Sequence, residues 1–132
     1  SVIEAIAHQS ADLLDALRSD TDIPIKEIRV DGGASVSNVM MQFQADITGI
    51  EVLRPHKTET TAWGAAALAG LAVGFWKDKD EIGRLWSCER RFMPEMDGKT
   101  RESKRTEWKR AAERSLSWAL NDTAQGKDQP PA

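Results

Sequence analysis

Two adjacent glycines, Gly32 and Gly33, stand between a short β-branched segment and a helical pattern of apolar residues. At such a junction the free backbone N–H groups and the positive end of the helix dipole attract anions, phosphates above all. Glycine also lets a nucleotide approach the backbone without meeting a Cβ atom. The same pair can be a plain tight turn, since it forms neither G-x-G-x-x-G nor a P-loop with its lysine. The residues alone therefore leave two interpretations, a nucleotide-binding loop and a turn.

Other polar residues could take part in this chemistry. Asp31 could lie near phosphates and magnesium or could accept backbone N–H bonds within the turn, and we favour the turn. Thr60 and Thr61 could touch a phosphate, but we favour a helix N-cap for them. His8 and His56 lack metal-ligand spacing and are predicted to be surface or helix residues. The chain therefore shows no metal-binding or catalytic constellation.

The spacing of apolar residues predicts the elements that would position the glycine loop. Short β-branched runs at 25–30 and 50–53 are predicted as strands, and the helix between them makes a parallel βαβ unit. Ala34 or Ser35 is predicted to begin that helix, and Gly49 to end it as its C-cap. Two strands leave exposed sheet edges, so a covering part is expected to be missing. Further helices are predicted over 2–19, 62–76, 78–86 and 100–121.

Burial can be predicted for several of these segments. The helix over 2–19 is predicted to bury one stripe. Its members are Ile3, Ile6, Ser10, Leu13 and Leu17, with Ala7 and Leu14 beside them. The helix over 62–76 is rich in Ala and Gly and is expected to be buried, whereas 87–99 is expected to be an irregular crossing. Residues 1–121 form the predicted domain part, and 122–132 are predicted to be a disordered polar tail.

Composition narrows the class of protein. The 132 residues are 40% hydrophobic and 30% charged, with a net charge of -3. That charge argues against a nucleic-acid-binding surface, and no apolar run reaches the roughly 20 residues of a membrane span. A signal-peptide pattern is missing, and the single cysteine, Cys88, fits a reducing compartment. We therefore expect a soluble cytoplasmic domain with neither a nucleic-acid nor a membrane partner.

One long stretch of the chain resembles a known family. Residues 29–55 read RVDGGASVSNVMMQFQADITGIEVLRP, and residues 59–76 read ETTAWGAAALAGLAVGFW. Both resemble the C-terminal nucleotide-binding domain of glycerol kinases, within the FGGY family of carbohydrate kinases. The resemblance covers about residues 1–121, and its details favour glycerol kinases over kinases of xylulose or gluconate.

This resemblance implies a fold and an activity. The fold class would be α/β, as part of an actin-like ATPase (ribonuclease H-like) domain with parallel strands, flanking helices and the first three strands missing. The whole protein would transfer the γ-phosphoryl group of ATP, with Mg²⁺, to glycerol and give glycerol 3-phosphate. The catalytic base and the glycerol-binding residues would lie in segments absent from this chain. The isolated chain is expected to be inactive and to pair with further copies of itself as a homo-oligomer.

The resemblance also implies nucleotide-binding residues. In that family the second glycine of Asp-Gly-Gly binds ATP, which corresponds to Gly33, with Gly32 beside it. A residue four positions later, usually Asn, adds a polar contact, and Ser37 holds that place here. Because Asn38 follows, either the Ser37 hydroxyl contacts the nucleotide through water or Asn38 takes part.

Two alternatives remain open at this point. A sister kinase of another polyol or sugar would carry much the same nucleotide loop, and the segments that select the substrate are not in this sequence. A non-catalytic interaction fragment that keeps the fold is the second alternative. The residues upstream of Ser1 would discriminate them, because a kinase of glycerol needs an aspartate base and glycerol-binding side chains there.

Overall fold

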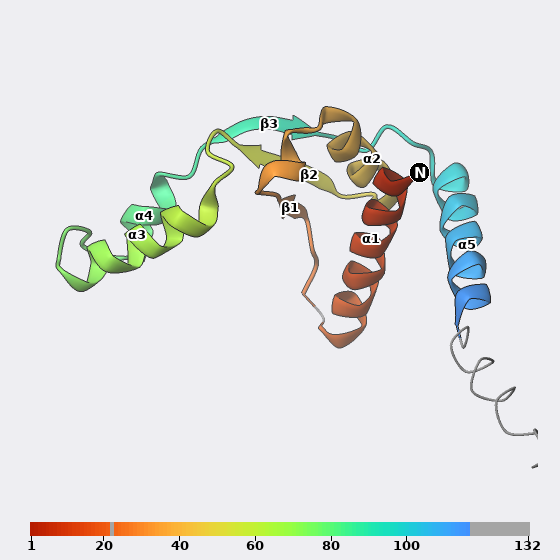
Figure 1. The fold of residues 1–132 in the computed structure, drawn as a ribbon, viewed down its shortest axis with the longest axis horizontal. Coiled ribbons are helices and arrows are strands. Elements are labelled where there is room, and N and C mark those ends of the chain that lie inside the picture. The colour runs from red at the N-terminus through yellow and green to blue at the C-terminus, as the bar shows by residue number, and fades with distance from the viewer. Residues whose placement is uncertain (22, 117–132) are drawn as a thin grey trace, which may run out of the picture.

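The computed structural model describes residues 1–21 and 23–116 (Figure 1). A three-stranded sheet lies between a group of helices on one side and a projecting helical segment on the other. In the part of the chain that the structure describes, no helix is both long and apolar enough to cross a membrane. In order, the elements are α1 (Val2–Asp20), β1 (Glu27–Arg29), the 3-10 helix η1 (Gly33–Val36), α2 (Asn38–Thr48), β2 (Glu51–Pro55), α3 (Thr60–Ala72), α4 (Lys79–Arg84), β3 (Cys88–Phe92) and α5 (Gly98–Ser115).

β2 is the central strand of a mixed sheet with the order β1-β2-β3. β1 and β2 run parallel with Ile28 opposite Val52, which confirms the predicted parallel pair. The helix between them, α2, ends at Gly49, whose φ of 68° is the left-handed conformation of a glycine C-cap. β3 pairs antiparallel with β2 and places Phe92 opposite Val52.

The prediction of an irregular crossing over 87–99 is wrong, because its first part forms β3. The three middle residues of that strand, Glu89, Arg90 and Arg91, are charged and exposed. Charged side chains suit an edge strand, where they discourage pairing with other chains. Here they also remove the apolar alternation by which a strand is detected in a sequence.

Two small clusters of buried side chains hold the described fold together. Between α2 and the sheet, the cluster contains Met40, Met41, Ala45, Val52 and Phe92. The other cluster joins α1 to α2 through Ala7, Ala11 and Ile47. Helix α2 therefore carries one apolar face for the sheet and another for α1.

Helix α1 does not bury the predicted stripe. Ile3, Ile6, Leu13 and Leu17 are 38%, 39%, 64% and 44% exposed. Helix α1 packs through Ala7, His8 and Ala11, of which Ala7 was predicted to lie beside the buried stripe. Ala7 and Ala11 let the backbone of α1 approach α2 closely. Helix α1 therefore contacts α2 through its small residues, and its large aliphatic side chains stay exposed.

Helix α3 is likewise more exposed than predicted. Ala67 is its buried residue, while Leu68 is 68% exposed. In Figure 1, α3 and α4 extend away from the sheet and from the other helices. The turn after α3 leaves Val73 and Phe75 exposed as well, at 82% and 72%.

The contact between α1 and α5 is built around His8. His8 is 7% exposed and stacks on Trp108 with ring centroids 5.1 Å apart, so of the two predicted places, the surface or a helix, the helix is the one observed. The Trp108 Nε1 donates to Asp12 at 2.7 Å. Arg105 donates to Asp12 at 2.6 Å, to Asp15 at 3.0 Å and to the His8 carbonyl at 3.0 Å.

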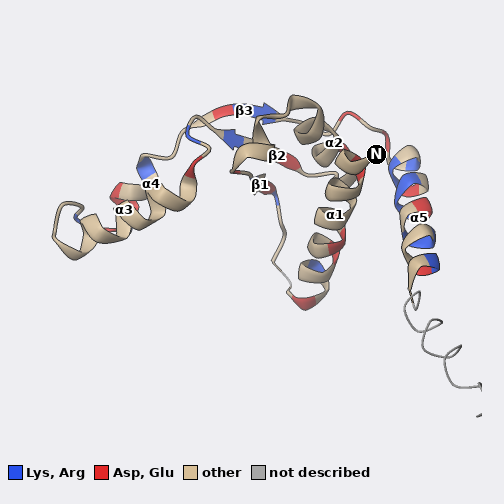
Figure 2. Ribbon diagram, in the orientation of Figure 1, with Lys and Arg blue, Asp and Glu red and all other residues tan. Residues whose placement is uncertain are grey.

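Positive and negative side chains alternate along α5, as expected of a solvated helix (Figure 2). The helix begins after Asp97, whose carboxylate accepts from the Thr100 N–H at 3.0 Å. Hydrogen bonds from the side chain and the backbone of Thr100 lower the pKa of Asp97. Residues 117–121 of the predicted last helix and the predicted tail over 122–132 lie outside the described residues.

We expect the stability of this helix contact to fall as the pH is lowered through about 6.5. Burial, helped by the charge of Arg105, lowers the pKa of His8 in the folded state. The unfolded chain then binds a proton that the folded chain does not, so the free energy of unfolding decreases as pH falls below 6.5. Urea unfolding at pH 7.5 and 5.5 measures this difference, and a His8→Gln variant should reduce it. An equal pH dependence in both proteins would contradict the assignment to His8.

Asp12 also makes the free energy of unfolding depend on pH, but at lower pH than His8 does. Burial alone would raise its pKa, but hydrogen bonds from Trp108 and Arg105 outweigh burial and hold the pKa of Asp12 below its usual value. The stabilisation from Asp12 is therefore lost only at more acidic pH than that from His8, so the two groups are separable.

Candidate functional site

The glycine loop lies at the carboxyl ends of the parallel strands β1 and β2. This edge of an α/β sheet is where ligands usually bind. The Gly32 N–H donates to the carbonyl of Thr58 at 2.7 Å, and the Thr60 hydroxyl donates to the carboxylate of Asp31. The loops that follow the two strands are therefore tied together by a backbone bond and a side-chain bond.

These contacts correct the N-cap interpretation of the threonines. Helix α3 has Glu59 at its N-cap position, without a side-chain capping bond, and begins at Thr60. The Thr60 hydroxyl is directed to Asp31 instead. Among the described residues, the Asp31 carboxylate accepts a hydrogen bond from the Thr60 hydroxyl and none from a backbone N–H. The structure therefore gives no support to the predicted role of Asp31 in accepting backbone N–H bonds.

Gly32 and Gly33 present bare backbone to solvent. A Cβ atom placed on either glycine would have no other atom within 4 Å. Gly32 has a φ of 77°, which a residue with a side chain rarely adopts, whereas the φ of Gly33 lies outside that range. Gly32 is thus needed for the shape of the loop, and Gly33 leaves open space above it.

Helix α2 begins later than predicted. Residues Gly33–Val36 form the 3-10 helix η1, and α2 starts at Asn38 with Ser37 as its N-cap. The Ser37 Oγ accepts from the Met40 N–H at 3.3 Å. Its hydroxyl hydrogen remains able to donate to a ligand, so capping and ligand binding are compatible at Ser37.

Replacing Ser37 by alanine should lower the free energy of unfolding by about 1 kcal/mol, because the N-cap acceptor is lost. Ser37→Asn should restore most of that stability, since Asn caps helices as well as Ser does. Thermal unfolding of both variants beside the unmodified protein measures the effect. If Ser37→Ala is as stable as the unmodified protein, the capping bond contributes nothing.

Asn38 has a structural partner in Arg54. The Asn38 Oδ1 accepts from the Arg54 Nη1 at 3.0 Å, and the Asn38 amide N–H groups remain able to donate to a ligand. The same Nη1 donates to the carbonyls of Ser35 at 3.0 Å and Val36 at 3.1 Å. Arg54 therefore holds both the 3-10 helix and the first residue of α2.

Sequence reasoning missed Arg54 as a site residue. The residue is buried, and its side chain is paired with the carboxylate of Glu89 at 2.7 Å. The hydrogen bond from Arg54 lowers the pKa of Glu89, so Glu89 stays ionised. A signal that could have found Arg54 is a charged residue that directly follows the apolar pair Val52-Leu53, because such a residue needs polar partners when it is buried.

A pocket of about 350 Å³ lies beyond the end of β2, next to Thr60. Its walls are largely aromatic and include Trp63, Trp76 and Trp86. The ammonium group of Lys57 lies 5.4 Å from the ring centroid of Trp63, as in a cation–π contact. Exposed His56 also lines this pocket.

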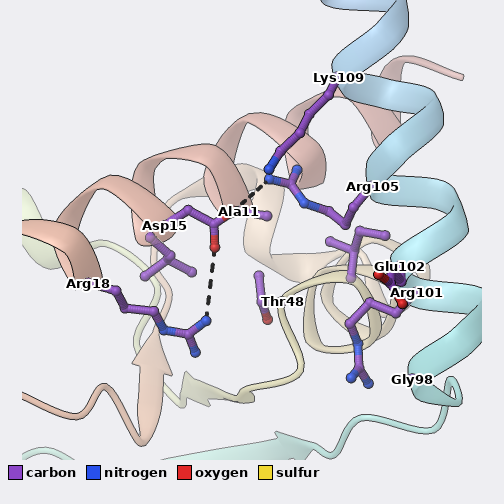
Figure 3. A pocket seen from close by; sticks show the side chains of 11 residues that line it. Ala11, Asp15, Arg18, Thr48, Gly98, Arg101, Glu102, Arg105 and Lys109 are labelled. Carbon is purple, nitrogen blue, oxygen red and sulfur yellow. Dashed lines mark hydrogen bonds and ion pairs between the residues drawn. The ribbon is translucent and has the colours of Figure 1, made fainter.

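A second hollow, of about 260 Å³, lies among α1, α2 and α5 (Figure 3). It is lined by Arg18, Arg101, Arg105 and Lys109. Arg105 is bound to acidic residues of α1, and Arg101 donates to the carbonyls of Asp46 and Met96. These two arginines fasten α5 to the rest of the chain, so we attribute the hollow to helix packing. Within residues 1–21 and 23–116, no group of three or more His, Cys, Asp or Glu could hold a metal ion.

Comparison with known proteins places this geometry in a family. The C-terminal domain of the FGGY family of carbohydrate kinases matches residues 1–73. The chain is 53% identical to glycerol kinase 2 of Thermotoga maritima over 118 residues, which are 89% of this chain and 24% of that protein. It is 56% identical to the glycerol kinase of Brachyspira hyodysenteriae over 117 residues, again 89% of this chain and 24% of that protein. The chain thus spans about a quarter of the length of these curated relatives.

Solved structures agree with the sequence comparison. The crystal structure of Plasmodium falciparum glycerol kinase with ADP has a TM-score of 0.73 and 37% identity, over 86% of this chain and 23% of that one. A ligand-bound xylulose kinase from Lactobacillus acidophilus has a TM-score of 0.68 and 23% identity, over 95% of this chain and 24% of that one. At that identity the second likeness concerns the fold alone.

Proposed function

The chain belongs to the FGGY family of carbohydrate kinases, within its C-terminal domain, and we propose that it is the ATP-binding part of a glycerol kinase. The observation that carries this proposal is the identity of 53–56% to two glycerol kinases over 89% of the chain. A relative with 37% identity has been crystallised with ADP, which supports a nucleotide as the ligand. The whole protein would phosphorylate glycerol to glycerol 3-phosphate in the cytoplasm, where ATP is supplied.

In this proposal the nucleotide lies against Gly32 and Gly33. The open space above both glycines fits a bound group that needs close approach to the backbone. Between the two candidates for a further polar contact, we propose Ser37. Its hydroxyl can donate while it caps α2, whereas the carbonyl group of Asn38 is already bonded to Arg54.

This chain's share of the reaction is binding and orientation. Phosphoryl transfer depends on placing the donor and acceptor in line and on neutralising charge. The glycine loop would hold the adenosine end of ATP, and the domain would move as one side of a closing cleft. We assign neither the catalytic base nor the Mg²⁺ ligands to this chain, and we place both in the remainder of the kinase.

The remainder of the kinase would also complete the fold. We propose an actin-like ATPase domain in which three preceding strands extend the sheet beyond β1. Exposed apolar surfaces support this extension, because large patches of this kind mark surfaces that another part covers. They lie on α1 at Ile3 and Leu13, on α3 at Leu68, and after α3 at Val73 and Phe75.

An assay of the full-length protein tests the proposed function. A coupled assay for glycerol 3-phosphate should show turnover that depends on ATP, Mg²⁺ and glycerol. Xylulose and gluconate should be poor acceptors under the same conditions. Preference for another polyol or sugar would show that the protein is a sister kinase, and ATP binding without transfer to any acceptor would indicate a non-catalytic protein.

A further inference from the structure

Arg54 joins the central strand to the glycine loop by a set of bonds that local turn formation does not require. Its guanidinium reaches the carbonyls of Ser35 and Val36 and the side chain of Asn38, all at 3.0–3.1 Å. These partners precede Arg54 in the sequence by 16 to 19 residues. The contact therefore fixes the position of η1 and of the start of α2 relative to β2.

The chemistry of this contact needs an arginine. A guanidinium is planar and presents several N–H donors in a fixed fork, so it can bind a carboxylate on one side and oxygens on the other. Here Nε and Nη2 donate to the carboxylate of Glu89 at 2.7 and 3.2 Å, and Nη1 donates to the loop. The side chain of Arg54 is 8% exposed, and Glu89 supplies the opposite charge that a buried cation requires.

Few other bonds hold the same loop. Gly32 is bonded to Thr58, and Ser35 folds back on the Gly32 carbonyl through its N–H and its hydroxyl. Without Arg54, the carbonyls of Ser35 and Val36 lose the side-chain donor that ties them to β2. The loop then has to be ordered when a ligand binds, which reduces affinity.

We propose that Arg54, held by Glu89, is a positioning residue that keeps the Gly32–Asn38 loop in its nucleotide-binding conformation. This inference rests on the proposed function, in which that loop binds the nucleotide. Arg54 acts through the loop and does not itself contact the nucleotide. Its influence is therefore on affinity for ATP and ADP and not on affinity for the acceptor.

The test compares two ion pairs on the same two strands of the full-length kinase. Arg54→Lys keeps the positive charge but replaces the fork by a single ammonium group. The matched control is Arg91→Lys, because exposed Arg91 on β3 pairs with Glu51 on β2 at 2.8 Å and does not touch the loop. Isothermal titration calorimetry with ADP, steady-state kinetics and hydrogen exchange of the loop amides are the measurements.

We expect Arg54→Lys to raise the Kd for ADP and the KM for ATP by about 10-fold, the scale of a misplaced binding group. The KM for glycerol should change by less than about twofold, and amides from Gly33 to Asn38 should exchange faster. Arg91→Lys should leave the Kd for ADP, both KM values and the amide exchange unchanged. Should Arg54→Lys fail to fold, Glu89→Gln supplies the test, with a smaller loss of ADP affinity in the same direction.

Each outcome tests the positioning role of Arg54, the proposed function, or both. Unchanged ADP affinity in folded Arg54→Lys or Glu89→Gln would overturn the positioning role and leave the proposed function intact. An equal loss of affinity for ATP and glycerol would also overturn it, since that result indicates general destabilisation. Absence of ADP binding by the unmodified enzyme would overturn both. ADP binding without glycerol phosphorylation would remove the proposed activity while the loop comparison still stands.

Discussion

Gly33→Val in the full-length kinase is expected to raise the KM for ATP about 10- to 100-fold. A Cβ atom at Gly33 meets nothing within 4 Å, so the fold itself has room for the branched side chain. In the proposed complex that room belongs to the nucleotide, and forcing extra carbon atoms into an occupied space costs about 1–3 kcal/mol. The KM for glycerol should change by less than about twofold, because glycerol is held by other segments.

The neighbouring glycine provides the control for this experiment. Gly32 has equal space around it but a φ of 77°, so Gly32→Ala strains the backbone. We expect Gly32→Ala to lower the free energy of unfolding, and Gly33→Val to leave it nearly unchanged. Thermal unfolding and kinetics of both variants separate the two effects. If Gly33→Val raised the KM for ATP and for glycerol equally, the assignment of Gly33 to the nucleotide would be wrong.

Local patterns sufficed for the part of the fold that positions the loop. The β-branched runs that contain β1 and β2, and the helical spacing between them, predict a parallel pair, which the structure confirms. Gly49 was predictable as a C-cap because a left-handed residue after a helix is nearly always glycine or asparagine. Both features depend on residues close together in the sequence.

Features that depend on distant residues could not be predicted in this way. Arg54 and Glu89 are 35 residues apart, and each looks like an ordinary surface charge until β2 and β3 are paired. His8 and Trp108 are even further apart, so neither burial nor stacking could be inferred from the surroundings of His8 in the sequence. The strand β3 was not predicted for a related reason: its charged residues suit the edge of the sheet, and that position is known only once β2 and β3 are paired.

The wrong burial predictions have a different cause. Helical periodicity identifies an apolar face on α1, and Ile3, Ile6, Leu13 and Leu17 do share that face, but periodicity does not say what covers it. The Ala- and Gly-rich composition of α3 likewise indicates a helix made for close packing. In both helices the apolar pattern would be buried only by a further part that packs against it, which the described residues do not include.

A polypeptide limited to residues 1–132 is accordingly expected to self-associate and to show no glycerol phosphorylation. Exposed Leu68, Val73 and Phe75, at 68%, 82% and 72%, would be joined by the unpaired N–H and C=O groups of β1, an edge strand of the described sheet. Such edges and apolar surfaces pair with further copies of the same chain. Light scattering at micromolar concentration should give a mass well above 14.6 kDa.

Activity and assembly should return together when the rest of the kinase is supplied. The preceding part of the protein, co-expressed as a separate chain, would cover β1, α1 and α3 and contribute the catalytic base, because phosphoryl transfer needs both sides of the cleft. We expect the larger assemblies of the 132-residue chain to be replaced by a two-chain complex with measurable turnover. A stable monomer of residues 1–132 would show that these surfaces need no cover. Turnover by that chain alone would contradict the division between nucleotide binding here and catalysis elsewhere.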